Sequence, residues 1–91
     1  MAIGVYFPES DFTSKQYDEA IKKLQAAGAS APKGRQYHVA FGDPEKLQIF
    51  DVWESEDAFA KFGETLMPIL GGLGYTPPEP MIAPIKNIIK G

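Results

Sequence analysis

Apolar residues alternate with other residues in four stretches of the chain, and this two-residue period predicts four β-strands. The predicted strands span residues 2–7, 36–42, 47–54 and 81–89. In two further stretches, which begin near Tyr17 and Phe59, apolar residues recur every three or four positions. That spacing is typical of one face of a helix. The pattern therefore predicts the order strand, helix, strand, strand, helix, strand.

Both predicted helices begin with a residue suited to cap free amide groups. Thr13 is followed three residues later by Gln16, which matches a capping box. Ser55 precedes two acidic residues, which suit the positive first turn of a helix. Gly28 favours a left-handed end to the first helix. We expect the first helix between Thr13 and Gly28, and the second from Ser55 to Leu70.

The second and third strands predict a hairpin, because the segment DPEK at 43–46 has the composition of a turn. A four-residue turn sets a register in which His38 lies opposite Asp51. The same face then pairs Ala40 with Ile49 and Gln36 with Trp53, and Tyr6 of the first strand joins it. The other face pairs Tyr37 with Val52, Val39 with Phe50 and Phe41 with Gln48. We expect this second face to meet the helices.

Two split strand–helix–strand units predict an α+β, ferredoxin-like fold, in which both helices cover one face of a four-stranded antiparallel sheet. The length of 91 residues suits a single domain over residues 1–91. On this interpretation the face that carries Trp53 and Tyr6 lies open, as an apolar patch larger than a monomer usually tolerates. We therefore predict a homodimer in which two sheets enclose a shared core or cavity.

Composition narrows the classes of partner. The net charge is −3 and the basic residues are scattered, which argues against nucleic acid as the main partner. The chain has no cysteine and one histidine, so we expect neither disulfides nor a metal site. It also lacks an apolar run of about 18 residues and a signal-peptide pattern, so we expect no contact with membranes and a cytoplasmic location.

His38, the only histidine, is the first candidate for chemistry. Beside Asp51 it could act as a general base, because a carboxylate orients the ring and stabilises its charged form. We therefore name His38 and Asp51 as candidate catalytic residues. The alternative is a hydrogen-bonded pair that satisfies two polar groups in the core.

Trp53 has two interpretations as well. It could stack on a flat aromatic ligand, or it could fill the interior as a large apolar side chain with its N–H bonded to Gln36 or to the backbone. Tyr6, Gln36 and Ile49 are expected on the same face. We name these four residues as candidate substrate-binding residues.

The chain resembles the dimeric α/β-barrel superfamily, which includes antibiotic-biosynthesis monooxygenase-like domains. The resemblance rests on YHVAF at 37–41, DVWES at 51–55, Phe59 or Phe62, and MPIL at 67–70, together with the order of elements over nearly the whole chain. Within this superfamily, the chain is similar above all to small uncharacterised bacterial members. The resemblance implies the fold and a homodimer. It leaves the activity open, because the superfamily includes cofactor-free oxygenases, haem-degrading enzymes, decarboxylases, isomerases and proteins without known catalysis.

Haem-degrading relatives place an axial histidine on the second helix and an asparagine on the first strand, and this chain has neither residue there. We therefore expect no cofactor. Two interpretations remain. The protein is a cofactor-independent monooxygenase or isomerase that acts on a small apolar or aromatic molecule, or it is a non-catalytic ligand-binding or assembly module in which His38, Asp51 and Trp53 only pack.

Overall fold

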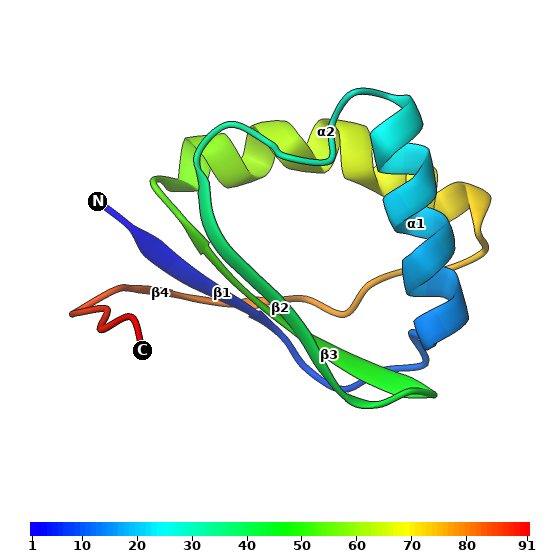
Figure 1. The fold of residues 1–91 in the computed structure, drawn as a ribbon, viewed down its shortest axis with the longest axis horizontal. Helices are drawn as coiled ribbons and strands as arrows, with labels where there is room; N and C mark the ends of the chain where they lie inside the picture. The colour runs from blue at the N-terminus through cyan, green and yellow to red at the C-terminus, as the bar shows by residue number, and fades with distance from the viewer.

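The computed structural model describes residues 1–91 and contains the six elements that the sequence predicts, in the predicted order. They are β1 (Ile3–Phe7), α1 (Ser14–Ala26), β2 (Arg35–Asp43), β3 (Lys46–Trp53), α2 (Glu56–Gly72) and β4 (Met81–Pro84). The strands form one antiparallel sheet in the order β2-β3-β1-β4, with both helices on one side of it (Figure 1). The predicted ferredoxin-like fold is confirmed.

The capping residues begin both helices as predicted. The Thr13 hydroxyl accepts from the Gln16 amide at 3.1 Å, and the Gln16 side chain accepts from the Thr13 amide at 3.0 Å. Ser55 accepts from the Ala58 amide at 3.1 Å at the start of α2. This helix continues past Leu70, and Pro68 lies within it. The local sequence thus determines where each helix begins.

The hairpin of β2 and β3 has the predicted register, with His38 opposite Asp51. Its turn is shorter than predicted, because Asp43 and Lys46 pair as the last residues of the strands. A β-bulge between Arg35 and Tyr37 changes the pairing at the other end of β2. Arg35 rather than Gln36 therefore lies opposite Trp53.

The strand β4 ends at Pro84, so the prediction of a strand to residue 89 is wrong. Proline has no amide hydrogen and is confined to sheet edges or strand ends. One backbone hydrogen bond follows, from the Ile85 amide to the Ala2 carbonyl at 3.0 Å. The pairing of β4 with β1 thus ends where the chain loses a donor.

The prediction of which sheet face meets the helices is also wrong. Trp53 is fully buried, packs with Ile3 and Val5, and contacts Phe59 and Phe62 of α2. The helices therefore cover the face of Trp53, His38 and Asp51. Strand alternation determines which residues share a face, but both faces of this sheet carry aromatic residues, so alternation could not decide which face is covered. Tyr6 pairs with Phe50 and lies on the opposite face.

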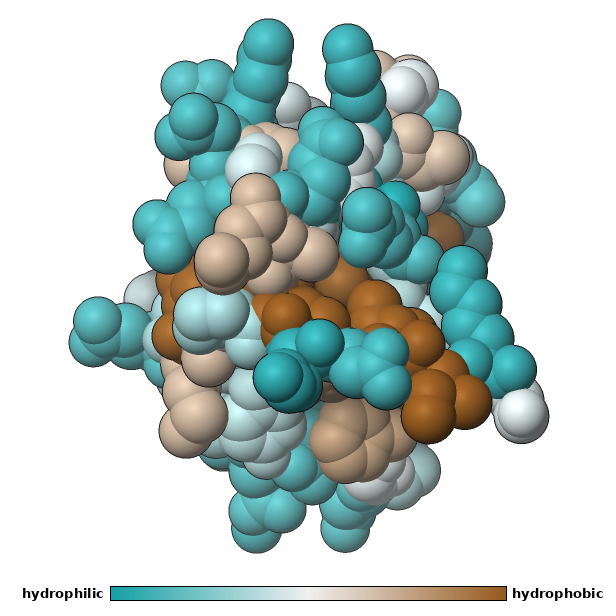
Figure 2. Space-filling model, turned by 90° about the vertical axis from the view of Figure 1, so that its left-hand side faces the viewer, coloured by the Kyte–Doolittle hydropathy of each residue, from teal (hydrophilic) through white to brown (hydrophobic).

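The uncovered face carries exposed aromatic residues. Tyr37 is 54% exposed and Phe41 is 41% exposed, and Tyr6, Val39 and Phe50 are half-buried beside them. Ile85 lies over one part of this face, near the Phe50 ring and Gly4. On the side of the molecule that holds both termini, hydrophobic side chains form a band among hydrophilic ones (Figure 2). Neither helix has the length and apolarity needed to cross a membrane.

Candidate functional site

A cavity of about 380 Å³ lies between the sheet and the two helices. Its lining is mainly apolar, and loop residues after α2, including Tyr75 and Pro77, lie at its border. The apolar lining includes Phe12, from the loop before α1, and the helix and strand residues Leu24, Ile49, Phe59, Phe62 and Leu66. Ligand pockets are typically about 300–1,000 Å³ and mostly apolar with few polar groups, so this cavity has the size and character of a small-molecule site.

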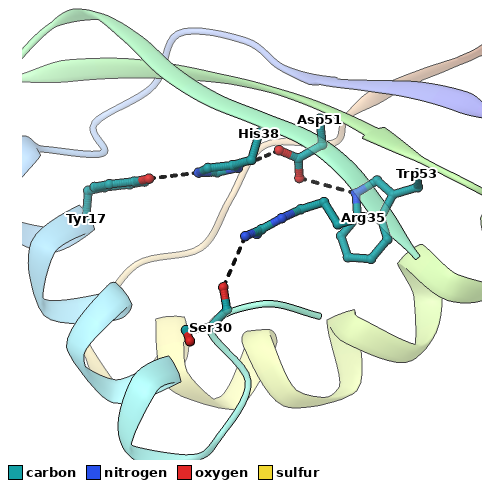
Figure 3. A network of polar contacts seen from close by, with 6 residues as sticks. All are labelled: Tyr17, Ser30, Arg35, His38, Asp51 and Trp53. Carbon is teal, nitrogen blue, oxygen red and sulfur yellow. Dashed lines mark hydrogen bonds and ion pairs between the residues drawn. The ribbon is translucent and has the colours of Figure 1, made fainter. Parts of the chain in front are cut away.

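A chain of hydrogen bonds reaches one wall of this cavity (Figure 3). The Tyr17 hydroxyl lies 2.7 Å from Nε2 of His38, and Nδ1 of His38 lies 2.6 Å from Oδ1 of Asp51. The indole Nε1 of Trp53 donates to Oδ2 of Asp51 at 3.3 Å. Tyr17 comes from α1, His38 from β2 and the other two residues from β3. The fold therefore assembles one polar network from three elements.

The chemistry of the three groups determines which atom donates in each hydrogen bond of the Tyr17–His38–Asp51 chain. Asp51 is only 5% exposed, and its carboxylate can only accept, so Nδ1 of His38 carries a hydrogen. Burial raises the pKa of the Tyr17 phenol above its ordinary value, Arg35 opposes this shift, and Asp51 and Asp18 add to it. Tyr17 is therefore protonated at neutral pH, and it donates to Nε2 of His38 when the imidazole is neutral. The planes of the two rings are within 5° of parallel.

The predicted catalytic residues His38 and Asp51 are thus in contact and both border the cavity. Among the predicted substrate-binding residues, Ile49 also lines it. Trp53 does not, because it lies fully buried in the wall beside Asp51, and its N–H bonds that carboxylate rather than Gln36.

Two predicted substrate-binding residues lie away from the cavity. Tyr6 donates to Gln48 on the uncovered face of the sheet. Side chains alternate between the two faces along β1, so Tyr6 points away from the face that carries Ile3 and Trp53. Gln36 is exposed, because the bulge in β2 places Arg35 opposite Trp53 instead. The sequence-based grouping of these two residues with Trp53 is therefore wrong.

Sequence reasoning missed Tyr17 and Arg35, which both line the cavity. Tyr17 falls in the apolar stripe of α1, a position that is typical of a core residue. A signal was available, because a buried phenol needs a hydrogen-bond partner and the pairing with Asp51 leaves one nitrogen of His38 free. The position of Arg35 depends on the bulge, for which the sequence gives no signal.

The structure contains no cluster of three or more His, Cys, Asp or Glu residues arranged to hold a metal ion. The polar groups on the cavity lining include the phenol, imidazole and carboxylate of the hydrogen-bonded chain and the guanidinium of Arg35. Such a set can move a proton and can bind an anion.

Comparisons with known proteins identify the fold. No protein-family model matches the chain, and no curated protein matches it. A conserved protein from Methanosarcina mazei Go1 is 18% identical, with 94% of each chain covered and a TM-score of 0.61. SnoaB, a cofactor-independent oxygenase from Streptomyces nogalater, is 14% identical, with a TM-score of 0.61 over 99% of this chain and 96% of that one.

A candidate antibiotic biosynthesis monooxygenase from Chloroflexus aurantiacus J-10-fl is 18% identical, with all of both chains covered and a TM-score of 0.60. The chain thus has the fold of antibiotic biosynthesis monooxygenase-like proteins, which confirms the resemblance seen in the sequence. At these identities the similarity shows the fold alone.

Proposed function

We propose that the cavity binds a small apolar or aromatic molecule and that the Tyr17–His38–Asp51 chain removes a proton from it. The reaction would be a monooxygenase-like or isomerase reaction without a cofactor. The observation that carries this proposal is a partly buried His–Asp pair that a protonated phenol connects to a mainly apolar cavity of about 380 Å³. Similarity in fold to a cofactor-independent oxygenase supports it.

The proposed proton transfer passes through Tyr17. Both ring nitrogens of His38 already have partners, so a ligand reaches the base through the phenol oxygen. An acidic O–H or C–H of the ligand gives its proton to Tyr17 Oη while the Tyr17 proton moves to Nε2 of His38. The products are a ligand anion and an imidazolium, which Asp51 stabilises. Reprotonation of the anion at another atom is isomerisation. For the monooxygenase-like outcome, dioxygen adds to a carbon of the anion that bears hydrogen and takes up a proton to form a hydroperoxide. Its O–O bond then breaks as that carbon loses its hydrogen, which leaves a carbonyl group and releases water.

A second candidate function is non-catalytic binding or assembly. It is favoured by the absence of any buried side-chain nitrogen or oxygen without a hydrogen-bond partner. The network is therefore satisfied without a ligand, as a purely structural network would be. The two candidates differ in what His38→Gln does: it should abolish turnover in the first, and it should alter only stability in the second.

Occupancy of the cavity can be tested with N-phenylnaphthylamine, a neutral aromatic dye whose fluorescence rises in apolar surroundings. Gly63 lines the cavity, and a Cβ built on it meets no atom within 4 Å. Gly63→Leu should therefore fill the space and weaken dye binding at least tenfold without destabilising α2, since leucine favours helices more than glycine does. Gly71→Leu is the matched control, because Gly71 also lies in α2 with nothing within 4 Å, but outside the cavity.

Equal dye binding by the two variants would refute a ligand site in the cavity. Native mass spectrometry of the protein purified without added ligand tests the natural occupant. A reproducible extra mass that Gly63→Leu loses and Gly71→Leu keeps would identify the compound for turnover assays. Tyr17→Phe and His38→Gln should then stop turnover while they leave the compound bound.

We also propose that a second copy of the chain covers the outer face of the sheet. The reason differs from the one that the sequence suggested, since the helices of the same chain cover the Trp53 face. Tyr37 and Phe41 are large, exposed and adjacent to further apolar residues, and soluble monomers seldom expose such contiguous patches. Light scattering should give a dimer that Phe41→Glu dissociates and that Ile89→Glu, in the exposed C-terminal tail, does not. A wild-type monomer at micromolar concentration would overturn this proposal.

A further inference from the structure

We infer that the molecule bound in the cavity carries an anionic oxygen group, such as a carboxylate, phenolate or enolate, and that Arg35 binds this group. The inference rests on the proposed function of the cavity as a small-molecule site and adds the chemical class of its ligand. Three observations support it. The backbone directs Arg35 into the cavity, most of its guanidinium donors have no partner in the protein, and the lining around it is mainly apolar.

The backbone before and after Arg35 aims this side chain inward. Gly34 has a φ of +93°, and a Cβ there would lie 2.7 Å from the Cβ of Ala58 in α2, so only glycine fits this close approach. The β-bulge that follows leaves Gln36 exposed and sets Arg35 opposite Trp53 on the cavity face. Bulges often re-aim a side chain beside a functional site. Without the bulge, strand alternation would point Gln36 inward and Arg35 outward.

The guanidinium has donors that no protein group uses. Arg35 makes one hydrogen bond, from Nη2 to the Ser30 carbonyl at 3.2 Å, whereas a guanidinium offers five N–H donors. The guanidinium lies over the Phe62 ring, with its Cζ 5.9 Å from the ring centre. Figure 3 shows the side chain extending beside Asp51 and Trp53 toward the space between His38 and the helices.

No carboxylate forms an ion pair with Arg35. The only ion pair within 4.0 Å in the structure joins His38 and Asp51, and Asp51 already accepts from His38 and Trp53. Glu79, the other carboxylate on the lining, is exposed and forms no ion pair. Arg35 is also the only lysine or arginine on the lining. It is therefore the one permanent positive charge facing a mainly apolar space.

An anionic ligand group would accept hydrogen bonds from the unused N–H donors of Arg35 and would pair with its positive charge. A carboxylate can accept two parallel hydrogen bonds from a guanidinium, and such charge-assisted bonds strengthen where water is excluded. In the proposed reaction the ligand becomes an anion as it loses its proton to the Tyr17–His38 chain. A fixed guanidinium on the same cavity stabilises that charge as it develops.

The test compares two dyes that share one ring system. Anilinonaphthalene sulfonate carries an anionic group, and N-phenylnaphthylamine lacks it. The wild-type protein should bind the sulfonate at least tenfold more tightly than the neutral dye at low salt, as expected for hydrogen bonds to a charged group. Wild-type affinities that favour the neutral dye would overturn the inference without the need for any variant.

Arg35→Met should weaken binding of the sulfonate about tenfold or more and change the affinity for the neutral dye less than twofold. Arg35→Lys should retain part of the preference, because it keeps the charge and loses the fork of donors. Lys22→Met, which removes one charge from the exposed side of α1, should leave both affinities unchanged.

The outcomes separate this inference from the proposed function. If both dyes bind equally well to wild type and to Arg35→Met, and Gly63→Leu removes both, the cavity is a ligand site but Arg35 does not bind an anion. A parallel loss of both dyes in Arg35→Met also overturns the inference, since Arg35 would then only maintain the cavity. If Gly63→Leu changes neither dye, the proposed ligand site itself fails.

Discussion

Replacing Asp51 by asparagine should destabilise the protein, because this carboxylate accepts from two donors at once. Nδ1 of His38 lies 2.6 Å from one carboxylate oxygen, and Nε1 of Trp53 lies 3.3 Å from the other. Asparagine has nearly the same shape but offers one oxygen and one NH₂ group. If its oxygen faces His38, the Trp53 N–H meets another donor. If its oxygen faces Trp53, its NH₂ group faces Nδ1 of His38, which accepts only in the other tautomer, and the Tyr17 hydroxyl then loses its acceptor on Nε2.

The magnitude follows from burial. Trp53 is fully buried, and Asp51 is 5% exposed, so a Trp53 N–H that loses its acceptor cannot turn to water. A buried polar group left without a partner costs about 1–3 kcal/mol. For a domain of this size, a loss of 1 kcal/mol lowers the melting temperature by about 4–8 °C. We therefore expect Asp51→Asn to melt about 5–20 °C below wild type.

Urea unfolding followed by tryptophan fluorescence measures this change, since Trp53 is the only tryptophan. The single indole N–H resonance in an NMR spectrum reports the same hydrogen bond directly and should shift in the variant. Asp43→Asn is the matched control. Asp43 is exposed in the β2–β3 turn and accepts from the Glu45 amide, and an asparagine oxygen can keep that bond. Its effect should stay within about 0.5 kcal/mol.

The reasoning would be refuted if Asp51→Asn and Asp43→Asn unfolded at the same urea concentration and the indole resonance did not move. That result would mean that Asp51 does not hold Trp53 and His38 in the interior. A large loss of stability with an unchanged indole resonance would place the defect at His38 alone.

Two further predictions concern Tyr17 and the glycine before Arg35. Burial raises the pKa of Tyr17, so an absorbance titration of the four tyrosines should lose its highest-pH step in Tyr17→Phe, and unchanged curves would contradict this. The associated stability is present below the ordinary pKa of about 10 and is lost as the pH rises through the raised value. In urea unfolding, Gly34→Ala should cost about 2 kcal/mol or more, because its φ is +93° and its Cβ would lie 2.7 Å from that of Ala58. Gly28→Ala, at a φ of +71° with nothing within 4 Å, should cost only about 1 kcal/mol, and equal losses would exclude the steric clash.

Local chemistry in the sequence was enough to predict several features of the fold. Thr13 and Ser55 begin the helices because a hydroxyl before a helix accepts from its free amides, whatever lies elsewhere in the chain. The pairing of His38 with Asp51 follows from the turn between two adjacent strands. These features depend on residues close together in the sequence.

Choosing the buried face of the sheet required the tertiary structure. Trp53 and Phe50 belong to opposite faces of β3, and alternation predicts that opposition but treats the two faces alike. The helices pack on the Trp53 face, where Phe59 and Phe62 contact the indole. The candidate site therefore lies inside one chain. The sequence had suggested a site between two chains.

The sequence by itself determined the order of elements, the helix starts, the hairpin register and the His38–Asp51 contact. The tertiary structure decided that Tyr17 of α1 meets His38 and that a bulge turns Arg35 into the cavity. The physical reason is the range of the interactions involved. Caps and turns act over a few residues, whereas the lining of a cavity depends on how distant elements pack and on one irregular residue in a strand.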